Sequence, residues 1–248
     1  MKRVAIITGA AGGIGRATAE AFHAAGYETI GTDRKEVKDY PADISLHKVD
    51  SSLEESVAGF AARMREEHEQ IDALVNNAAI QICKPLVEMT LEEWNATMAS
   101  NLSSIFIMSR DLYPLIKKAK GSIVNVSSVH AMATSRDIAA YAASKGGILA
   151  LTRAMALEFG VDDVRVNTIL PGAVDTPMLR DGMSRGHVSG TLQERMQALA
   201  AKTVLGRIGM PDEIARVILF LADSQQSGFM TGQSLIVDGG ASARLSTE

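Results

Sequence analysis

The stretch Thr8-Gly-Ala-Ala-Gly-Gly-Ile-Gly15 decides the fold, because it joins a short apolar run to the start of a helical pattern. The run before it, Arg3–Thr8, reads RVAIIT and is typical of a buried strand. The pattern after it predicts a helix from Gly13 to Ala25. Glycines at such a turn let the backbone approach a pyrophosphate, and helix N-terminal N–H groups favour an anion. A tight structural turn would also use glycines, but the position directly after an N-terminal strand favours a dinucleotide site.

Short apolar runs alternate with segments of helical period along the rest of the chain. The predicted strands are 28–32, 46–49, 73–76, 122–126, 164–170 and 234–237. The predicted helices include one opened by a capping box at Ser52–Glu55, one running from a second capping box at Thr90–Glu93 to about Ile116, and those over 139–159 and 211–222. This alternation predicts an α/β fold: a Rossmann-type, doubly wound parallel sheet with helices on both faces, in a single domain over residues 1–248.

Two segments interrupt this rhythm. Residues 35–44 are too short and too mixed in character for a crossover helix, so the third strand is expected to follow a loop. Residues 177–202 are rich in Met, Gly, Ser and Arg, and we expect them to form a mobile segment that covers the substrate.

The composition excludes several classes of protein. With 46% hydrophobic and 22% charged residues in 248, the chain is expected to fold around a buried core. A net charge of −4 gives no general attraction to nucleic acid or to an anionic membrane, and no apolar run reaches 18 residues. Cys83 is the single cysteine, so no intrachain disulfide is possible, and the five histidines show no metal-ligand spacing. We therefore expect a cytoplasmic protein without a metal.

A carboxylate marks the expected cofactor preference. Asp33 ends the second predicted strand, 18 residues past Gly15, where it would accept hydrogen bonds from the adenosine ribose hydroxyls. The same charge would repel a 2′-phosphate, which favours NAD over NADP. Arg34 complicates this interpretation because its guanidinium could pair with such a phosphate, whereas Gly12 leaves the glycine turn without a basic side chain.

Four polar residues occupy consistent positions in the predicted topology. Tyr141 and Lys145 are spaced i, i+4 and so share one face of a helix. Ser128 follows the strand 122–126, at the sheet edge where open α/β sheets bind ligands. Asn101 lies within a predicted helix, where asparagine is unfavourable unless its amide has a specific task. Each residue alone is commonplace, but the four together favour a functional site.

These features resemble the short-chain dehydrogenase/reductase family over most of the chain, from Arg3 to about Gly240. The cofactor pattern TGxxxGxG of that family is met by Thr8, Gly9, Gly13 and Gly15, and its NNAG element appears as Asn76–Ala79 with alanine last. The resemblance implies a catalytic tetrad of Asn101, Ser128, Tyr141 and Lys145. It also implies that the reaction interconverts a secondary alcohol and a ketone. It implies cofactor contacts at Gly9, Gly13, Ile14, Gly15, Asp33, Asp50, Ser51, Asn77, Ala78, Tyr141, Lys145, Pro171, Gly172, Val174 and Thr176.

The chemistry that these residues support is proton transfer coupled to hydride transfer. Tyr141 would be the general acid/base, with a free phenol pKa of about 10 that Lys145 and the oxidised nicotinamide would lower. Ser128 would bind the same substrate oxygen, and Asn101 would hold a water that links Lys145 to solvent. Lys145 would also reach the nicotinamide ribose.

The substrate is less well specified by the sequence. Gln81 and His130 are the candidate substrate residues near the site, with Arg136 beside them. Further cations lie in the 177–202 segment: Arg180, Arg185, His187 and Arg195. This polar rim favours a sugar, polyol or hydroxy acid, with a 3-oxoacyl-thioester reductase as the alternative enzyme and a dinucleotide sensor or scaffold as the non-enzyme alternative. The family resemblance further implies a homotetramer, with subunit contacts through helices around 91–116 and 139–159.

Overall fold

In this computed structural model, which describes residues 2–184 and 190–243, seven parallel strands form one sheet. The order across the sheet is β3-β2-β1-β4-β5-β6-β7, so the direction of progression reverses between β1 and β4. The strands are β1 Val4–Thr8, β2 Glu28–Asp33, β3 Ser45–Lys48, β4 Ala73–Asn76, β5 Ser122–Val126, β6 Arg165–Pro171 and β7 Ser234–Val237. The predicted doubly wound parallel sheet is confirmed.

Burial along the strands explains their sequence pattern. Every residue of β1, β4, β5 and β6 is buried, because helices cover both faces of the sheet. Strands buried on both faces read as continuous apolar runs and not as alternating ones. The edge strands β3 and β7 are only half-buried or exposed, which is why their sequences give weaker signals.

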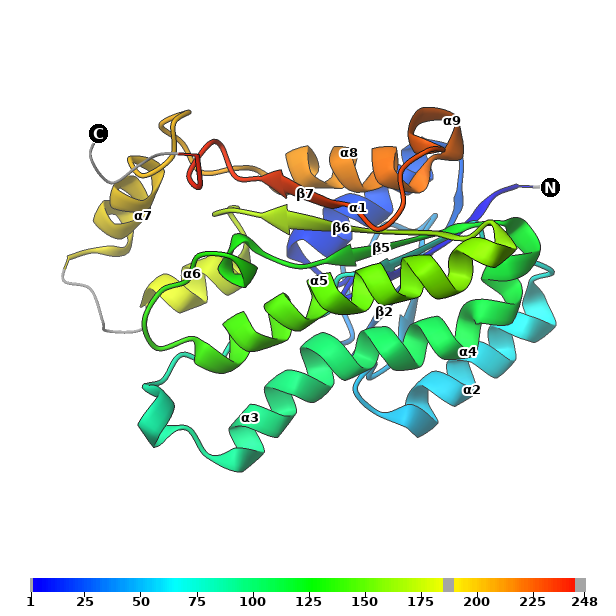
Figure 1. The fold of residues 1–248 in the computed structure, drawn as a ribbon, viewed down its shortest axis with the longest axis horizontal. Helices are drawn as coiled ribbons and strands as arrows, with labels where there is room; N and C mark the ends of the chain where they lie inside the picture. The colour runs from blue at the N-terminus through cyan, green and yellow to red at the C-terminus, as the bar shows by residue number, and fades with distance from the viewer. Residues whose placement is uncertain (1, 185–189, 244–248) are drawn as a thin grey trace.

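The helices form two layers (Figure 1). On one face lie α2 Glu54–Glu67, α4 Ser104–Ala119 and α5 Ala139–Phe159, and on the other lie α1 Gly13–Ala24 and α8 Pro211–Ala222. Each layer has its own apolar core, one centred on residues such as Phe60, Met108 and Ile148, the other on Phe22, Ile214 and Ile218. The shorter helices are α3 Leu91–Met98, α6 Pro177–Ser184, α7 Leu192–Ala200 and α9 Ser224–Ser227.

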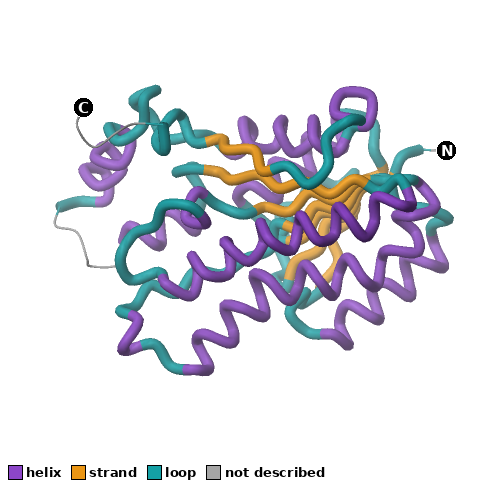
Figure 2. The backbone as a smooth tube through the Cα atoms, viewed as in Figure 1, coloured by secondary structure: helices purple, strands orange, loops and turns teal. Residues whose placement is uncertain are grey.

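Because all strands run parallel, their carboxyl ends meet at one edge of the sheet. The loops that follow these ends, and the helices α6 and α7, lie beyond that edge (Figure 2). Residues far apart in sequence therefore come together there, as expected for an open α/β sheet.

Two predicted segments differ from the structure. The single long helix expected over 90–116 is divided into α3 and α4 by a π-helical turn at Ala99–Ser103. The 177–202 segment was expected to be a mobile loop, but its described parts form the helices α6 and α7. A capping box at Thr191 and Glu194 begins α7. No helix within the described ranges is long and apolar enough to cross a membrane.

Candidate active site

The turn between β1 and α1 requires glycine at several positions. Gly9 and Gly13 have φ of +67° and +55°, in the left-handed region that other residues rarely adopt. A Cβ on Gly15 would lie 2.1 Å from the carbonyl oxygen of Gly9, which no backbone adjustment of this turn accommodates easily. The open N-terminus of α1 that results fits a pyrophosphate.

Asn77 supports this turn from the neighbouring strand. Its side-chain amide donates to the carbonyl oxygens of Thr8 (3.0 Å) and Gly9 (3.2 Å). The Thr8 hydroxyl in turn accepts from the backbone N–H groups of Asn77 and Ala78, at 2.9 and 3.0 Å. The structure thus gives the Asn77 side chain a bracing contact with the glycine turn.

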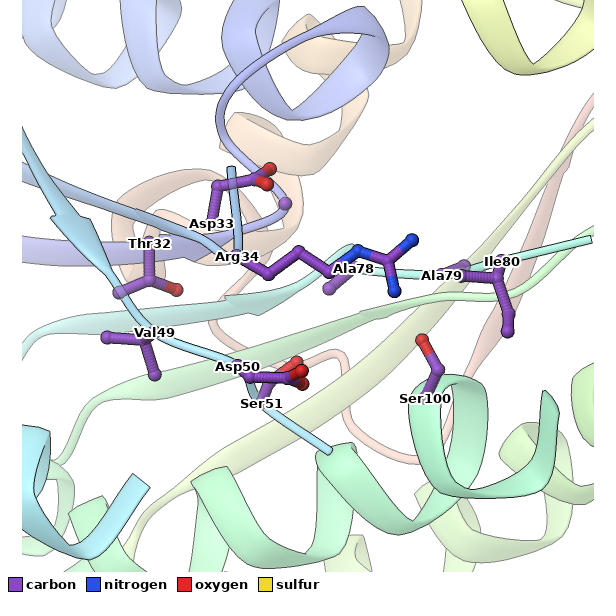
Figure 3. Close-up of a pocket in the computed structure, with 11 residues that line it drawn as sticks. Thr32, Asp33, Arg34, Val49, Asp50, Ser51, Ala78, Ala79, Ile80 and Ser100 are labelled. Carbon is purple, nitrogen blue, oxygen red and sulfur yellow. The ribbon is translucent and has the colours of Figure 1, made fainter. Parts of the chain in front are cut away.

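A pocket opens at the carboxyl ends of β1, β2, β3 and β4 (Figure 3). It brings together five residues that the resemblance assigns to the cofactor: Gly9, Asp33, Asp50, Ser51 and Ala78. The other lining residues were not among the expected cofactor contacts, although Arg34 had been noted beside Asp33. They are Thr32, Arg34, Val49, Ala79, Ile80 and Ser100. Whether such a residue lines the pocket depends on where each strand ends, and the residue type does not show this.

Asp33 and Arg34 are used differently in this pocket. The Asp33 carboxylate accepts from the backbone N–H groups of Ala11 (3.1 Å) and Lys35 (2.9 Å), which ties the end of β2 to the glycine turn. Arg34 makes no hydrogen bond or ion pair with any residue that the structure describes. Figure 3 shows its side chain extending across the pocket toward Ala78 and Ala79. The residues present therefore fit the adenosine half of a dinucleotide.

The segment after β6 closes the other side of the glycine turn. A Cβ on Gly13 would lie 3.3 Å from Cγ2 of Thr176, and a Cβ on Gly172 would lie 2.7 Å from Cα of Asp238. Pro171 ends β6, and Val174 is buried in the core that also covers α1. The structure thus brings the predicted 171–176 segment beside the turn, where Ile14 lies half-buried in the first turn of α1.

Ser128, Tyr141 and Lys145 come together where β5 faces α5. All three are buried, with Lys145 only 2% exposed. The Lys145 Nζ donates to the carbonyl oxygen of Val126 at 2.8 Å and lies 5.5 Å from the centre of the Tyr141 ring. The Ser128 side chain lies near enough to the Tyr141 phenol to influence its pKa, and the Ser128 Oγ accepts from the N–H of His130 at 3.2 Å.

Burial dominates the ionisation of this group in the protein alone. It raises the pKa of Tyr141 to about 12, a rise that the nearby Ser128 side chain opposes, and lowers the pKa of Lys145 to about 7. In the protein by itself the pKa of Tyr141 is thus raised, and the lowering expected from Lys145 together with the oxidised nicotinamide stays a prediction for the cofactor complex. A lysine that is half neutral near pH 7 offers less charge to the phenol, while desolvation penalises the phenolate fully.

Asn101 lies in the π-helical turn and is fully buried. Its Oδ1 accepts from the N–H of Ile80 (2.8 Å), and its Nδ2 donates to the Ile80 carbonyl (2.9 Å) and to Ser144 Oγ (3.0 Å). Both amide hydrogens are thus used, so a relay water would have to be held by an oxygen of Asn101. The side chain joins the loop after β4 to the helix that carries Tyr141.

The candidate substrate residues lie around this group. The His130 ring packs edge-on against Tyr141 with 6.0 Å between centroids, and burial lowers the pKa of His130, which keeps its ring neutral at pH 7. A Cβ on Gly182 of α6 would lie 3.8 Å from Gln81 Oε1, so the covering helix passes close to Gln81.

The cations proposed from the sequence mostly serve the covering segment itself. Arg180 forms two hydrogen bonds with Asp175, at 2.7 and 2.8 Å, and Arg195 donates to the Met183 carbonyl. Arg136 is exposed, and Arg185 and His187 lie outside the described residues. Neither Arg180 nor Arg195 is therefore an unengaged cation waiting for a ligand.

Exposed apolar side chains lie in the segments that follow β4 and β5, at short 3-10 turns and at the start of α3, which the sequence interpretation of a polar rim did not anticipate. They are Leu86 (61% exposed), Val87 (93%), Leu91 (73%) and Met132 (64%). The signal for them was present in the run Pro85-Leu-Val87, but the expected helix boundaries did not show that it faces solvent. No cluster of three potential metal ligands occurs among residues 2–184 and 190–243.

Comparison with known proteins agrees with this geometry. A family model described as enoyl-(acyl carrier protein) reductase matches residues 9–242. The chain is 35% identical to a 3-oxoacyl-[acyl-carrier-protein] reductase of Thermotoga maritima over 249 residues, covering 96% of this chain and 97% of that protein. It is also 35% identical to an acetoacetyl-CoA reductase of Shinella zoogloeoides, covering 97% and 98%. The ligand-free aldohexose dehydrogenase of Thermoplasma acidophilum superposes with a TM-score of 0.93 at 31% identity, covering 99% of this chain and 96% of that one.

Proposed function

Because the chain belongs to the short-chain dehydrogenase/reductase family of oxidoreductases, we propose that it reduces the 3-keto group of a 3-oxoacyl thioester to a hydroxyl with NADH. The meeting of Ser128, Tyr141 and Lys145 at the carboxyl edge of the sheet carries the reaction class. The names of the relatives and the apolar residues around the site support the acyl substrate. This choice places the alternative weighed from the sequence ahead of the sugar, polyol or hydroxy acid.

The protein's own residues provide binding and proton transfer. A bound nicotinamide would supply the hydride to the substrate carbon. Ser128 binds the substrate oxygen, and Tyr141 donates its hydroxyl proton to that oxygen as negative charge develops there. A phenol with a pKa raised to about 12 is fully protonated at pH 7, which suits a proton donor. In the reverse direction, the Tyr141 phenolate oxygen accepts the proton from the substrate hydroxyl.

The cofactor is held by two kinds of group. The glycine turn and the N-terminus of α1 bind the pyrophosphate. The Asp33 carboxylate accepts two backbone hydrogen bonds and has further lone pairs, which accept hydrogen bonds from the adenosine ribose hydroxyls. The negative charge of Asp33 disfavours a 2′-phosphate, which supports NAD. Lys145 would hold the nicotinamide ribose.

A sugar dehydrogenase is the second candidate. It is supported by the structural likeness to the aldohexose dehydrogenase and by Asp33, since NAD suits an oxidative enzyme. The two candidates share all four tetrad residues and differ only in what the loops after β4, β5 and β6 accept.

An absorbance assay at the nicotinamide band separates these candidates. The purified protein is given acetoacetyl-CoA with NADH or NADPH, and a panel of aldohexoses and polyols with NAD⁺. We expect acetoacetyl-CoA reduction with NADH, with Tyr141→Phe as the inactive control. Turnover confined to sugars would establish the second candidate, and binding of NADH without turnover of any substrate would favour a sensor or scaffold.

We also propose a cytoplasmic homotetramer formed by a single-domain chain. Phe106 on α4 is 52% exposed and Leu157 on α5 is 81% exposed, and both suit a subunit contact. In Leu157→Asp, a charge on that face should reduce the mass found by light scattering to that of a dimer or monomer, while an exposed Glu158→Ala control keeps the original mass. An unchanged mass in Leu157→Asp would place the subunit contact elsewhere.

A further inference from the structure

Three consecutive residues at the end of β5 each contact the helix that carries Tyr141 and Lys145. The Val126 carbonyl accepts from Lys145 Nζ at 2.8 Å, and the Ser128 side chain lies near the Tyr141 phenol. Between them, the Ser127 hydroxyl donates to the backbone carbonyl of Lys145, also at 2.8 Å. The first and third contacts belong to the proposed catalytic machinery, whereas nothing in that machinery uses Ser127.

We propose that Ser127 is a positioning residue that fixes the lateral distance between the Ser128 end of β5 and Lys145 on α5. Its side chain is buried, with the residue 3% exposed, so its hydroxyl is not available to solvent. Lys145 lies within α5, where its carbonyl already has the ordinary role of accepting from the following turn of the helix. The Ser127 bond is therefore an additional contact between strand and helix, formed at the catalytic lysine itself.

This contact acts on Tyr141 through Lys145. The charge of Lys145 lies 5.5 Å from the centre of the phenol ring, and Coulomb energy at such a distance in a buried site changes steeply with displacement. The neighbouring titratable group is His130 from the turn after β5, whose ring burial keeps neutral. Burial is the cause that shifts the pKa of Lys145, with no carboxylate acting on it. A small retreat of the ammonium group is thus not compensated by another charge.

The same strand supplies a matched control. Ser122 begins β5, is 1% exposed, and its Oγ has no hydrogen-bond partner in the structure. Ser122→Ala therefore removes a buried hydroxyl from the same strand without breaking a contact. Ser127→Ala removes the hydroxyl that donates to the Lys145 carbonyl. Ser127→Cys keeps a side chain of similar volume, but its thiol is a weaker hydrogen-bond donor.

The inference rests on the proposed roles of Tyr141 and Lys145, and its test includes a readout that needs no substrate. Tyrosinate absorbance is followed during a pH titration of the NAD⁺ complex, and subtraction of the matching Tyr141→Phe background isolates Tyr141 from the other three tyrosines. We expect the Tyr141 midpoint to rise by about one pH unit in Ser127→Ala, equal to about 1.4 kcal/mol, and by less in Ser127→Cys. Ser122→Ala should titrate as the unaltered protein does.

Turnover provides the second measurement. With the substrate established above, Ser127→Ala should lose about tenfold in kcat near pH 7, with the pH profile displaced in the same direction and KM little changed. An unaltered titration and pH profile in a Ser127→Ala protein that melts normally would overturn the positioning role. Full activity in Tyr141→Phe would instead overturn the proposed chemistry, so the two failures are distinguishable.

Discussion

The two halves of the sheet form their parts of the site by different means. On the side of β1, β2 and β3, the glycine turn, the start of α1 and the Asp33 carboxylate form a region made mostly of backbone, and its pocket is open. On the side of β5 and α5, buried side chains bond to one another and to carbonyl oxygens, as Lys145 does to Val126. The first region offers shape and N–H donors to a ligand, and in the second region desolvation shifts the pKa values of Tyr141 and Lys145.

This difference predicts where a substitution affects binding and where it affects catalysis. Removing a group from the catalytic side should change turnover while the cofactor still binds, because no described residue that lines the proposed adenosine pocket hydrogen-bonds Tyr141. Removing a charge from the cofactor side should change which dinucleotide is used while proton transfer continues. Three substitutions test this separation, from the largest expected effect to the smallest.

Tyr141→Phe should lower kcat by about a thousandfold or more, since it removes the proton donor from a buried site. The affinity for NADH, measured by fluorescence titration, should change by less than about threefold, because the phenol hydroxyl makes no contact with the adenosine pocket. A comparable loss of NADH affinity would show that the two halves are not separate. A thermal melt within a few degrees of the unaltered protein serves as the folding control.

Asp33→Asn should raise the preference for NADP over NAD, expressed as a ratio of kcat/KM values, by about 10- to 100-fold. The substitution removes the charge that repels a 2′-phosphate, and like-charge repulsion is worth a few kcal/mol. It keeps an oxygen that can still accept from Ala11. Adding Arg34→Ala should reverse most of the gain, because Arg34 is the cation that extends across the pocket. An unchanged ratio would mean that Asp33 serves the glycine turn alone.

Lys145→Met should alter how stability depends on pH. The folded-state pKa of Lys145, about 7, is below that of the unfolded chain at 10.5, so between these values the unfolded state binds more protons. Stability of the cofactor-free protein should therefore rise with pH across this window, by about 1 kcal/mol per pH unit from this group. In Lys145→Met the rise should be smaller by that amount, as measured by urea unfolding at pH 7.5 and 9. Equal slopes would show that the ammonium group is not desolvated.

The same contrast explains what the sequence could predict. The glycine turn could be located from Gly9, Gly13 and Gly15, and its expected ligand class needed their position directly after an N-terminal strand as well. The catalytic tetrad needed four weak signals together with the order of strands. Ser127 could not be distinguished from any other serine, because its role depends on which way the residue after β5 faces.

Local sequence patterns mispredicted the start of α2 and the continuity of the helix that contains Asn101. The capping box at Thr90 is present as expected, but the one at Ser52 is absent, since Asp50 accepts from both the N–H and the hydroxyl of Ser52 and α2 begins later. The π-helical turn that contains Asn101 lies inside a stretch of good helical periodicity. Its extra residue is fixed by the contacts of Asn101 with Ile80 and Ser144, which are long-range and invisible to a local pattern.

The position of β1 has a consequence for how the chain folds as it is made. Ala5 pairs with Thr29 on one side and with Ala73 on the other. A nascent chain can therefore form the β1–β2 pair early, but the second edge of β1 stays open until β4 has left the ribosome, and such non-local parallel pairing is slow. An open apolar strand edge is a site for aggregation during that interval. The strand that supports the glycine turn is thus also one whose completion depends on distant sequence, since its second edge stays open to other chains until β4 has emerged and paired with it.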